Sequence, residues 1–192
     1  SFKVNQWLEM WTGEYKEPPP KFFYLFKMKA KDLQKLAGVR RRETKQRESG
    51  KQDLGIQRRL EKERTKEIQQ YVKHGFPLST MRENVIQEQL YLTKPGWLPS
   101  AIIVNIRKID DDLEEKVDPE DIINISNEGQ VYYLELPKNF GDTWIKKGAE
   151  PIQIIDGQHR LYSFEDLDLE GDFELPVVAF HGLGISWQAY LF

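Results

Sequence analysis

Short apolar runs, separated by turn residues and by helically spaced segments, predict a chain of alternating strands and helices. The aromatic run Phe22–Met28 predicts a strand, and Ala30–Ala37 follows it with the spacing of a helix. Three further apolar runs predict strands that we expect to lie in one sheet, namely Ala101–Ile106, Pro151–Ile155 and Phe173–Phe180.

The region between these strands is helical in pattern. Periodicity predicts a helix over Ile56–Val72 that ends at Gly75-Phe76-Pro77. Thr80 and Glu83 have the spacing of a capping box, which predicts a second helix from this point to Leu92.

Turn residues complete the outline of the fold. Asn127-Glu128-Gly129 lies between Asp121–Ile125 and Gln130–Leu136 and predicts a β-hairpin. The pair Asp156-Gly157 predicts a sharp turn into a helix over Gln158–Leu167. The pattern therefore indicates an α/β (α+β) fold, with a small mixed sheet flanked by helices.

The two ends of the chain differ from its middle. Lys16–Lys21 is a proline-rich break, and an aromatic arm with Trp7 and Trp11 precedes it. We therefore divide the chain into an N-terminal arm, residues 1–20, and one domain, residues 21–192. Ser186–Phe192 begins like a helix without a helix-ending signal, so we expect a domain truncated at its C-terminus.

Composition and charge exclude several classes of protein. The 192 residues include no cysteine, which excludes disulfides, zinc–thiolate sites and thiol catalysis within this segment. With no membrane-length apolar run and no signal-peptide pattern, we expect a cytoplasmic protein without a membrane partner. Residues 27–73 contain 16 Lys and Arg against 7 Asp and Glu, whereas residues 108–128 contain 2 against 9. The basic flank suits phosphates, although two solvated faces would look the same.

The segment Asp156-Gly157-Gln158-His159-Arg160 is the strongest candidate for a ligand site. An apolar strand leads into this turn, and a helix start presents unpaired N–H groups that favour phosphate. Gly157 permits close approach, and Arg160 is suited to hold two phosphate oxygens. His159 and Asp156 are the candidate catalytic groups, with Asp156 also a possible Mg²⁺ ligand or helix cap. The alternative is a purely structural strand–helix junction.

A second candidate group lies on the predicted helix at Ile56–Val72. Arg64 falls near the centre of its apolar stripe, with Gln57 on the same face and Arg58 directed elsewhere. A core-facing arginine requires a partner, so we expect its guanidinium to be buried and bonded to a carboxylate such as Asp156 or to a ligand phosphate. The alternative is a side chain that extends outward to solvent. No pattern of metal ligands is apparent.

Several of these segments together resemble the DGQHR-domain family, which includes DndB-like proteins of DNA phosphorothioation and phage-defence loci. The match is literal at 156–160 and extends to Gly55-Ile56-Gln57-Arg58, Arg64, Trp97–Ile102 and Pro176–Phe180. The resemblance implies a fold similar to the ParB N-terminal domain and sulfiredoxin. It also implies phosphate contacts from Gly157, Gln158, His159 and Arg160, approached by Gln57, Arg58 and Arg64.

The resemblance leaves the activity open among three functions. The first is a DNA-associated domain that binds a nucleoside triphosphate, with Mg²⁺, and hydrolyses it slowly. The second is a non-enzymatic DNA-binding regulator or scaffold that works with partner proteins of the same system. The third is a ParB-like nuclease. Sulfiredoxin chemistry is excluded because it requires a cysteine, and Gln158-His159 departs from the usual ParB pair.

Overall fold

A six-stranded mixed sheet forms the centre of the molecule. The computed structural model describes residues 1–6, 21–38, 62–111, 113–165, 167, 169 and 171–191. Within them the sheet has the order β1-β2-β8-β4-β7-β3. Its strands are β1 (Phe2–Asn5), β2 (Phe22–Lys29), β3 (Ala37–Gly38), β4 (Ile102–Ile106), β7 (Ile152–Asp156) and β8 (Glu174–His181).

The strand pairing confirms the predicted fold class. β4 is parallel to β8 and antiparallel to β7, and β3 is parallel to β7, so the sheet is mixed. The three apolar runs become β4, β7 and β8 of one sheet, as predicted. The predicted hairpin is also confirmed, because β5 (Asn124–Glu128) and β6 (Val131–Glu135) pair antiparallel.

β1 is a strand that the sequence analysis did not predict. Phe2–Asn5, within the segment assigned to the N-terminal arm, pairs antiparallel with Phe22–Leu25 of β2. The Ser1 hydroxyl donates to the Tyr132 carbonyl oxygen at 2.8 Å, which holds the first residue against the hairpin. Residues 7–20, which include Trp7, Trp11 and the prolines of the break, lie outside the described residues, as do residues 39–61.

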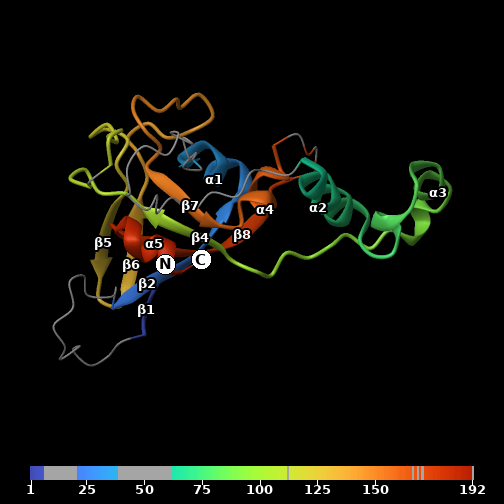
Figure 1. Cartoon of the computed structure of the whole chain (residues 1–192), viewed down its shortest axis with the longest axis horizontal. Coiled ribbons are helices and arrows are strands. Elements are labelled where there is room, and N and C mark those ends of the chain that lie inside the picture. Colours follow the sequence, from blue (N-terminus) through green and yellow to red (C-terminus); the bar gives the residue numbers. More distant parts are fainter. Residues whose placement is uncertain are drawn as a thin grey trace, which may run out of the picture.

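The helices pack mostly around one face and one end of the sheet. Their bounds are α1 (Ala30–Leu36), α2 (Lys62–His74), α3 (Glu83–Glu88), α4 (Gln158–Tyr162) and α5 (Ile185–Tyr190). Figure 1 shows α2 and α3 projecting at one end of the molecule, opposite the β5–β6 hairpin. We call residues 62–97, which include α2, α3 and the 3-10 helices η1 (Leu78–Thr80) and η2 (Leu90–Leu92), the helical projection.

One face of the sheet carries the hydrophobic core. Alternate residues along each strand point to the same face, which makes this side continuously apolar. α1 and α4 cover it with Leu33, Leu36 and Leu161. The fully buried strand residues on this face are Ile102, Val104, Ile106, Ile152, Leu175, Val177 and Ala179.

Two predicted helices end differently from what the sequence indicated. Thr80 belongs to η1, where its hydroxyl donates to the Pro77 carbonyl oxygen, so the predicted capping box is wrong. α3 begins at Glu83 without a side-chain cap and ends at Glu88, before η2. α4 ends at Tyr162 rather than Leu167, because Phe164 turns back into the core and its N–H bonds the Leu161 carbonyl.

The central position of β4 makes its apolar residues sensitive to truncation. Ile106 is 0% exposed, and Ile106→Ala leaves a cavity in the core. We expect a loss of about 2–5 kcal/mol in the free energy of unfolding, measured by urea denaturation. Ile145→Ala is the matched control, because Ile145 is 82% exposed and its loss should change stability by at most about 0.5 kcal/mol. Equal effects of the two substitutions would contradict this assignment of the core.

Candidate functional site

The Asp156–Arg160 turn depends on a glycine at its second position. Gly157 has φ of 92° and is the N-cap residue of α4, and its carbonyl accepts a hydrogen bond from the Leu161 N–H. A Cβ at this position would lie 2.8 Å from Ile102 Cδ1 and 3.0 Å from Arg160 Nη2. Glycine is therefore required both by the backbone conformation and by close packing against the start of β4.

The guanidinium of Arg160 is directed at the chain itself. Its Nη1 donates to the carbonyl oxygens of Ser100, at 2.7 Å, and Ala101, at 3.0 Å. Its Nη2 donates to Asp156 Oδ2 at 3.2 Å. The side chain is 20% exposed, so these contacts form in a partly desolvated place. Arg160 thus connects the turn to the residues that enter β4.

The other members of the predicted site are also integrated into the fold. His159 is buried, and Asp156, Gln158 and Arg160 are partly buried. Ser163, which is fully buried, donates through its hydroxyl to the Arg160 carbonyl at 2.7 Å. α4 has only five residues, so the predicted helix is shorter and offers a weaker dipole at its N-terminus than the sequence suggested.

α4 also contacts both connections between the helical projection and the sheet. Where the projection begins, α2 packs against α4. Where the projection returns to the sheet, Arg160 holds the carbonyls of Ser100 and Ala101. The turn and α4 therefore fix how the projection is attached, as the position of α4 beside α2 in Figure 1 shows.

The structure does not place Arg64 as predicted. Arg64 is exposed and has no ion pair with the described residues, so the expectation of a buried, paired guanidinium is wrong. The buried side of α2 is centred on Val72, with Ile68 and Thr65 half-buried beside it. At 100° per residue, Arg64 lies about 80° around the helix from Val72. Gln57 and Arg58 lie outside the described residues.

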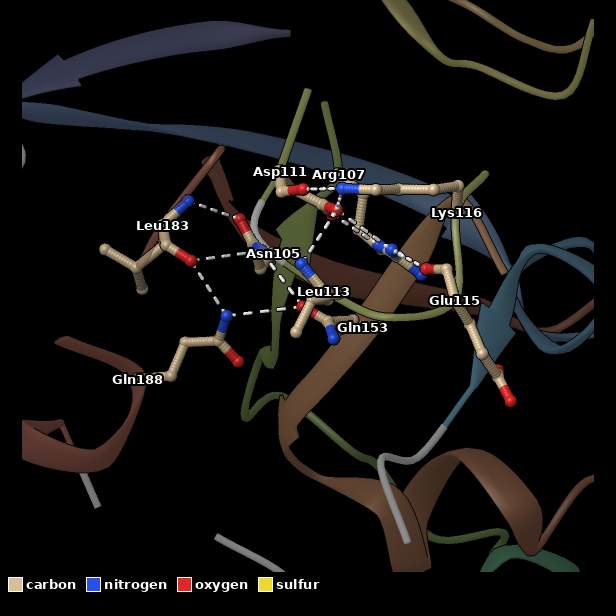
Figure 2. Close-up of polar contacts among 9 residues, drawn as sticks. All are labelled: Asn105, Arg107, Asp111, Leu113, Glu115, Lys116, Gln153, Leu183 and Gln188. Atoms are coloured by element: carbon tan, nitrogen blue, oxygen red, sulfur yellow. Dashed lines mark hydrogen bonds and ion pairs between the residues drawn. The ribbon is translucent and has the colours of Figure 1, made fainter. Parts of the chain in front are cut away.

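A polar cluster that the sequence analysis missed lies on the second face of the sheet (Figure 2). Asn105 Oδ1 accepts from the Leu183 N–H at 2.8 Å, and its Nδ2 donates to Gln153 Oε1 at 3.1 Å. Gln188 Nε2 of α5 donates to the Leu183 carbonyl oxygen at 2.8 Å and to Gln153 Oε1 at 3.2 Å. Amide groups from β4, β7 and α5 therefore hold the C-terminal segment on the sheet.

Arg107 orders the acidic loop after β4, as the other part of Figure 2 shows. Arg107 is 4% exposed, and its Nε donates to Asp111 Oδ2 at 2.7 Å and its Nη2 to Asp111 Oδ1 at 3.1 Å. The same Nη2 donates to the Glu115 carbonyl oxygen at 2.5 Å. A buried arginine is tolerated because its donors are satisfied, and here they fix a loop that is otherwise rich in carboxylates.

The sequence contained a signal for the first of these clusters. Asn105 interrupts the apolar run Ala101–Ile106, and Gln153 interrupts Pro151–Ile155. A polar residue inside a buried strand requires a hydrogen-bond partner, so these two positions indicate a polar contact on the second face. Their partner at Leu183 is a backbone group, which no sequence pattern identifies.

Other kinds of site are not evident in the described part of the chain. No group of three or more His, Asp and Glu side chains there is placed to hold a metal ion. A shallow hollow is lined by residues that include Lys29, Phe164 and Phe173, away from the Asp156–Arg160 turn. No described helix has the length and apolar character needed to span a membrane.

Comparison with known proteins gives one result. A family model described as DndB, DNA-sulfur modification-associated, matches residues 20–192 of this chain. The match includes the Asp156–Arg160 turn, α4, the helical projection and the polar cluster of Asn105, Gln153 and Gln188. No curated protein and no solved structure matched.

Loss of the Asn105 amide should weaken the attachment of the C-terminal segment. Asn105→Ala leaves the Leu183 N–H and the Gln153 amide with fewer partners, which should cost about 1–3 kcal/mol in the free energy of unfolding. Hydrogen exchange at the Leu183 amide should accelerate. Asn124→Ala, at an exposed position of β5, is the control and should change neither measurement. Unchanged protection of Leu183 in Asn105→Ala would disprove the role of this amide.

Proposed function

The chain belongs to the DndB DNA-sulfur modification-associated family, and from this premise we propose that it is a non-enzymatic DNA-binding regulator or scaffold of a DNA-sulfur modification system. In this proposal the Asp156–Arg160 turn is a structural anchor rather than a nucleotide site. The DNA is held elsewhere on the surface, and partner proteins of the system supply the chemistry.

The contacts of Arg160 are the observation that carries this proposal. A phosphate ligand at the turn would have to replace two backbone carbonyls and the Asp156 carboxylate. Breaking these contacts leaves the Ser100 and Ala101 carbonyls without the donors that now satisfy them, which is unfavourable in a partly buried place. The space beside Gly157 is occupied by Ile102 and Arg160 instead of being open to a ligand.

The distribution of charge supports binding to DNA. Residues 40–97 contain 14 Lys and Arg against 8 Asp and Glu, whereas residues 98–192 contain 7 against 19. Residues 40–97 therefore favour contact with a polyanion such as DNA, whereas residues 98–192 repel it. The net charge of −3 hides this division.

The two enzymatic alternatives, a nucleoside triphosphatase and a nuclease, each require an arrangement of residues that differs from the described geometry. A triphosphate with Mg²⁺ at the turn would need Asp156 and Arg160 to release each other, with His159 reaching the ligand from a buried position. A nuclease would need clustered carboxylates for its metal ions. Among the described residues Asp156 is paired with Arg160, and Asp111 is paired with Arg107.

Calorimetry distinguishes a structural role of the Asp156–Arg160 turn from binding of a phosphate ligand there. We expect no saturable heat when ATP, CTP or GTP is titrated into the chain, with or without Mg²⁺, and no phosphate release. DNA should bind under the same conditions, measured by fluorescence anisotropy. Saturable nucleotide binding that Arg160→Gln abolishes in a folded protein would overturn the anchor role.

Two other substitutions of Arg160 give a stability readout. Arg160→Ala should lower the free energy of unfolding by about 2 kcal/mol, since it removes a partly exposed ion pair and two charge-assisted hydrogen bonds. Arg160→Lys should recover only part of the loss, because one ammonium group cannot reproduce the planar fork. Lys138→Ala, at an exposed position, is the control. A fully stable Arg160→Ala protein would contradict the anchor role.

A further inference from the structure

The helical projection exposes an unusual amount of apolar side chain. Within it only Val72, Leu78 and Ile86 are buried large hydrophobic residues. Large hydrophobic residues that remain exposed are Tyr71, Phe76, Met81, Leu90, Tyr91, Leu92 and Trp97. Exposed apolar side chains gathered on one small element mark a binding surface more often than an ordinary solvated face.

Backbone contacts hold the returning chain against the end of α2. The Lys94 N–H donates to the His74 carbonyl at 3.1 Å, and the Gly96 N–H donates to the Tyr71 carbonyl at 3.1 Å. The returning chain therefore lies along the end of α2. Phe76 follows the end of α2, and Tyr91 and Trp97 flank the contact segment Lys94–Gly96; these three side chains, which are 73%, 82% and 83% exposed, we call the aromatic cluster.

Gly75 makes this close approach possible. Its φ is +67°, and a Cβ at this position would lie 1.7 Å from the Lys94 carbonyl oxygen. Any other residue would displace the returning chain together with Lys94 and Trp97. The arrangement of the aromatic cluster is thus built into the backbone and does not depend on flexible side chains alone.

α2 also carries a line of lysines. On a helix with 100° per residue, Lys62, Lys66 and Lys73 fall within about 40° of one another. All three are exposed, as is Lys94, and none has an ion pair with a described carboxylate. These ammonium groups are therefore available to an anionic ligand.

We infer that the helical projection binds single-stranded DNA, with its lysines on the phosphates and its aromatic cluster against unpaired bases. This rests on the proposed function and names the surface and the form of DNA. Aromatic faces interleaved with cations are the usual means of holding a single strand, because every base offers a flat face. A duplex hides those faces, so highly exposed aromatic rings would gain little from it.

The attachment of the projection fixes where its lysines and aromatic residues lie relative to the sheet. α4 contacts α2, and Arg160 holds the returning chain at Ser100 and Ala101. The carboxylate-rich segment at residues 108–128 belongs to the body of the molecule beyond the sheet, where it repels a strand. Figure 1 shows the projection at the end of the molecule opposite the hairpin.

Binding of the 192-residue chain to fluorescein-labelled 20-mers, single-stranded or duplex, tests this inference by anisotropy at several salt concentrations. Trp97→Ala and Tyr91→Ala should each weaken binding of the single strand about tenfold and affect the duplex less. Lys66→Glu with Lys73→Glu should reduce the salt slope for the single strand by roughly 0.7 per lysine removed.

Matched substitutions on the body of the molecule are the controls. Tyr133→Ala, on an exposed part of β6, and Lys138→Glu should leave DNA binding unchanged. Circular dichroism should show the same folded content in every variant, because all the substituted side chains are exposed.

The outcomes separate this inference from the proposed function. Parent protein that binds neither form of DNA overturns the proposed function. Parent protein that binds DNA while the Trp97, Tyr91 and lysine variants bind equally well overturns the inference alone. Sedimentation that shows self-association, lost in the same variants without a change in DNA affinity, would assign the surface to a second copy of the chain and also overturn the inference.

Discussion

The contact between Arg160 and the residues that lead into β4 determines how three parts of this molecule meet. The turn before α4, the central strand and the returning chain of the helical projection all converge on one guanidinium. Such a contact is strong because a planar arginine can satisfy several acceptors at once. Gly157 is part of the same arrangement, since any side chain there would meet Ile102 and Arg160. A motif that looks like a ligand site in the sequence thus has a structural explanation that is complete in itself.

The second face of the sheet is held by polar contacts where the first is held by apolar packing. Asn105 and Gln188 bind the backbone of Leu183, and both donate to Oε1 of Gln153 in the neighbouring strand. Buried amides are favourable only when their partners are in place, so they specify one position for α5 more strictly than hydrophobic contacts would. Arg107 has a similar effect on the acidic loop, since its buried charge requires Asp111.

The division of charge connects the fold with its family. The family of this chain is associated with DNA-sulfur modification, while residues 98–192 contain 19 Asp and Glu against 7 Lys and Arg. In our proposal the acidic body and the helical projection have different tasks. The body is kept away from the polyanion, and the projection meets it. In this proposal the domain orients DNA and partner proteins, and the partners supply the chemistry.

The sequence by itself determined the strands β2, β4, β7 and β8, the hairpin, the mixed α/β class and the turn at Gly157, because apolar periodicity and turn residues act locally. It could not determine helix ends such as Thr80 and Tyr162, where core packing overrides capping patterns. It also misplaced Arg64, since the buried side of α2 is selected by what packs against Val72 and not by the helix alone. Only the tertiary structure decided that Arg160 binds Ser100 and Ala101 and that Asn105 binds Leu183, because these partners are backbone groups distant in sequence. Backbone carbonyls and N–H groups are present at nearly every residue, so only the folded chain selects which of them a side chain meets.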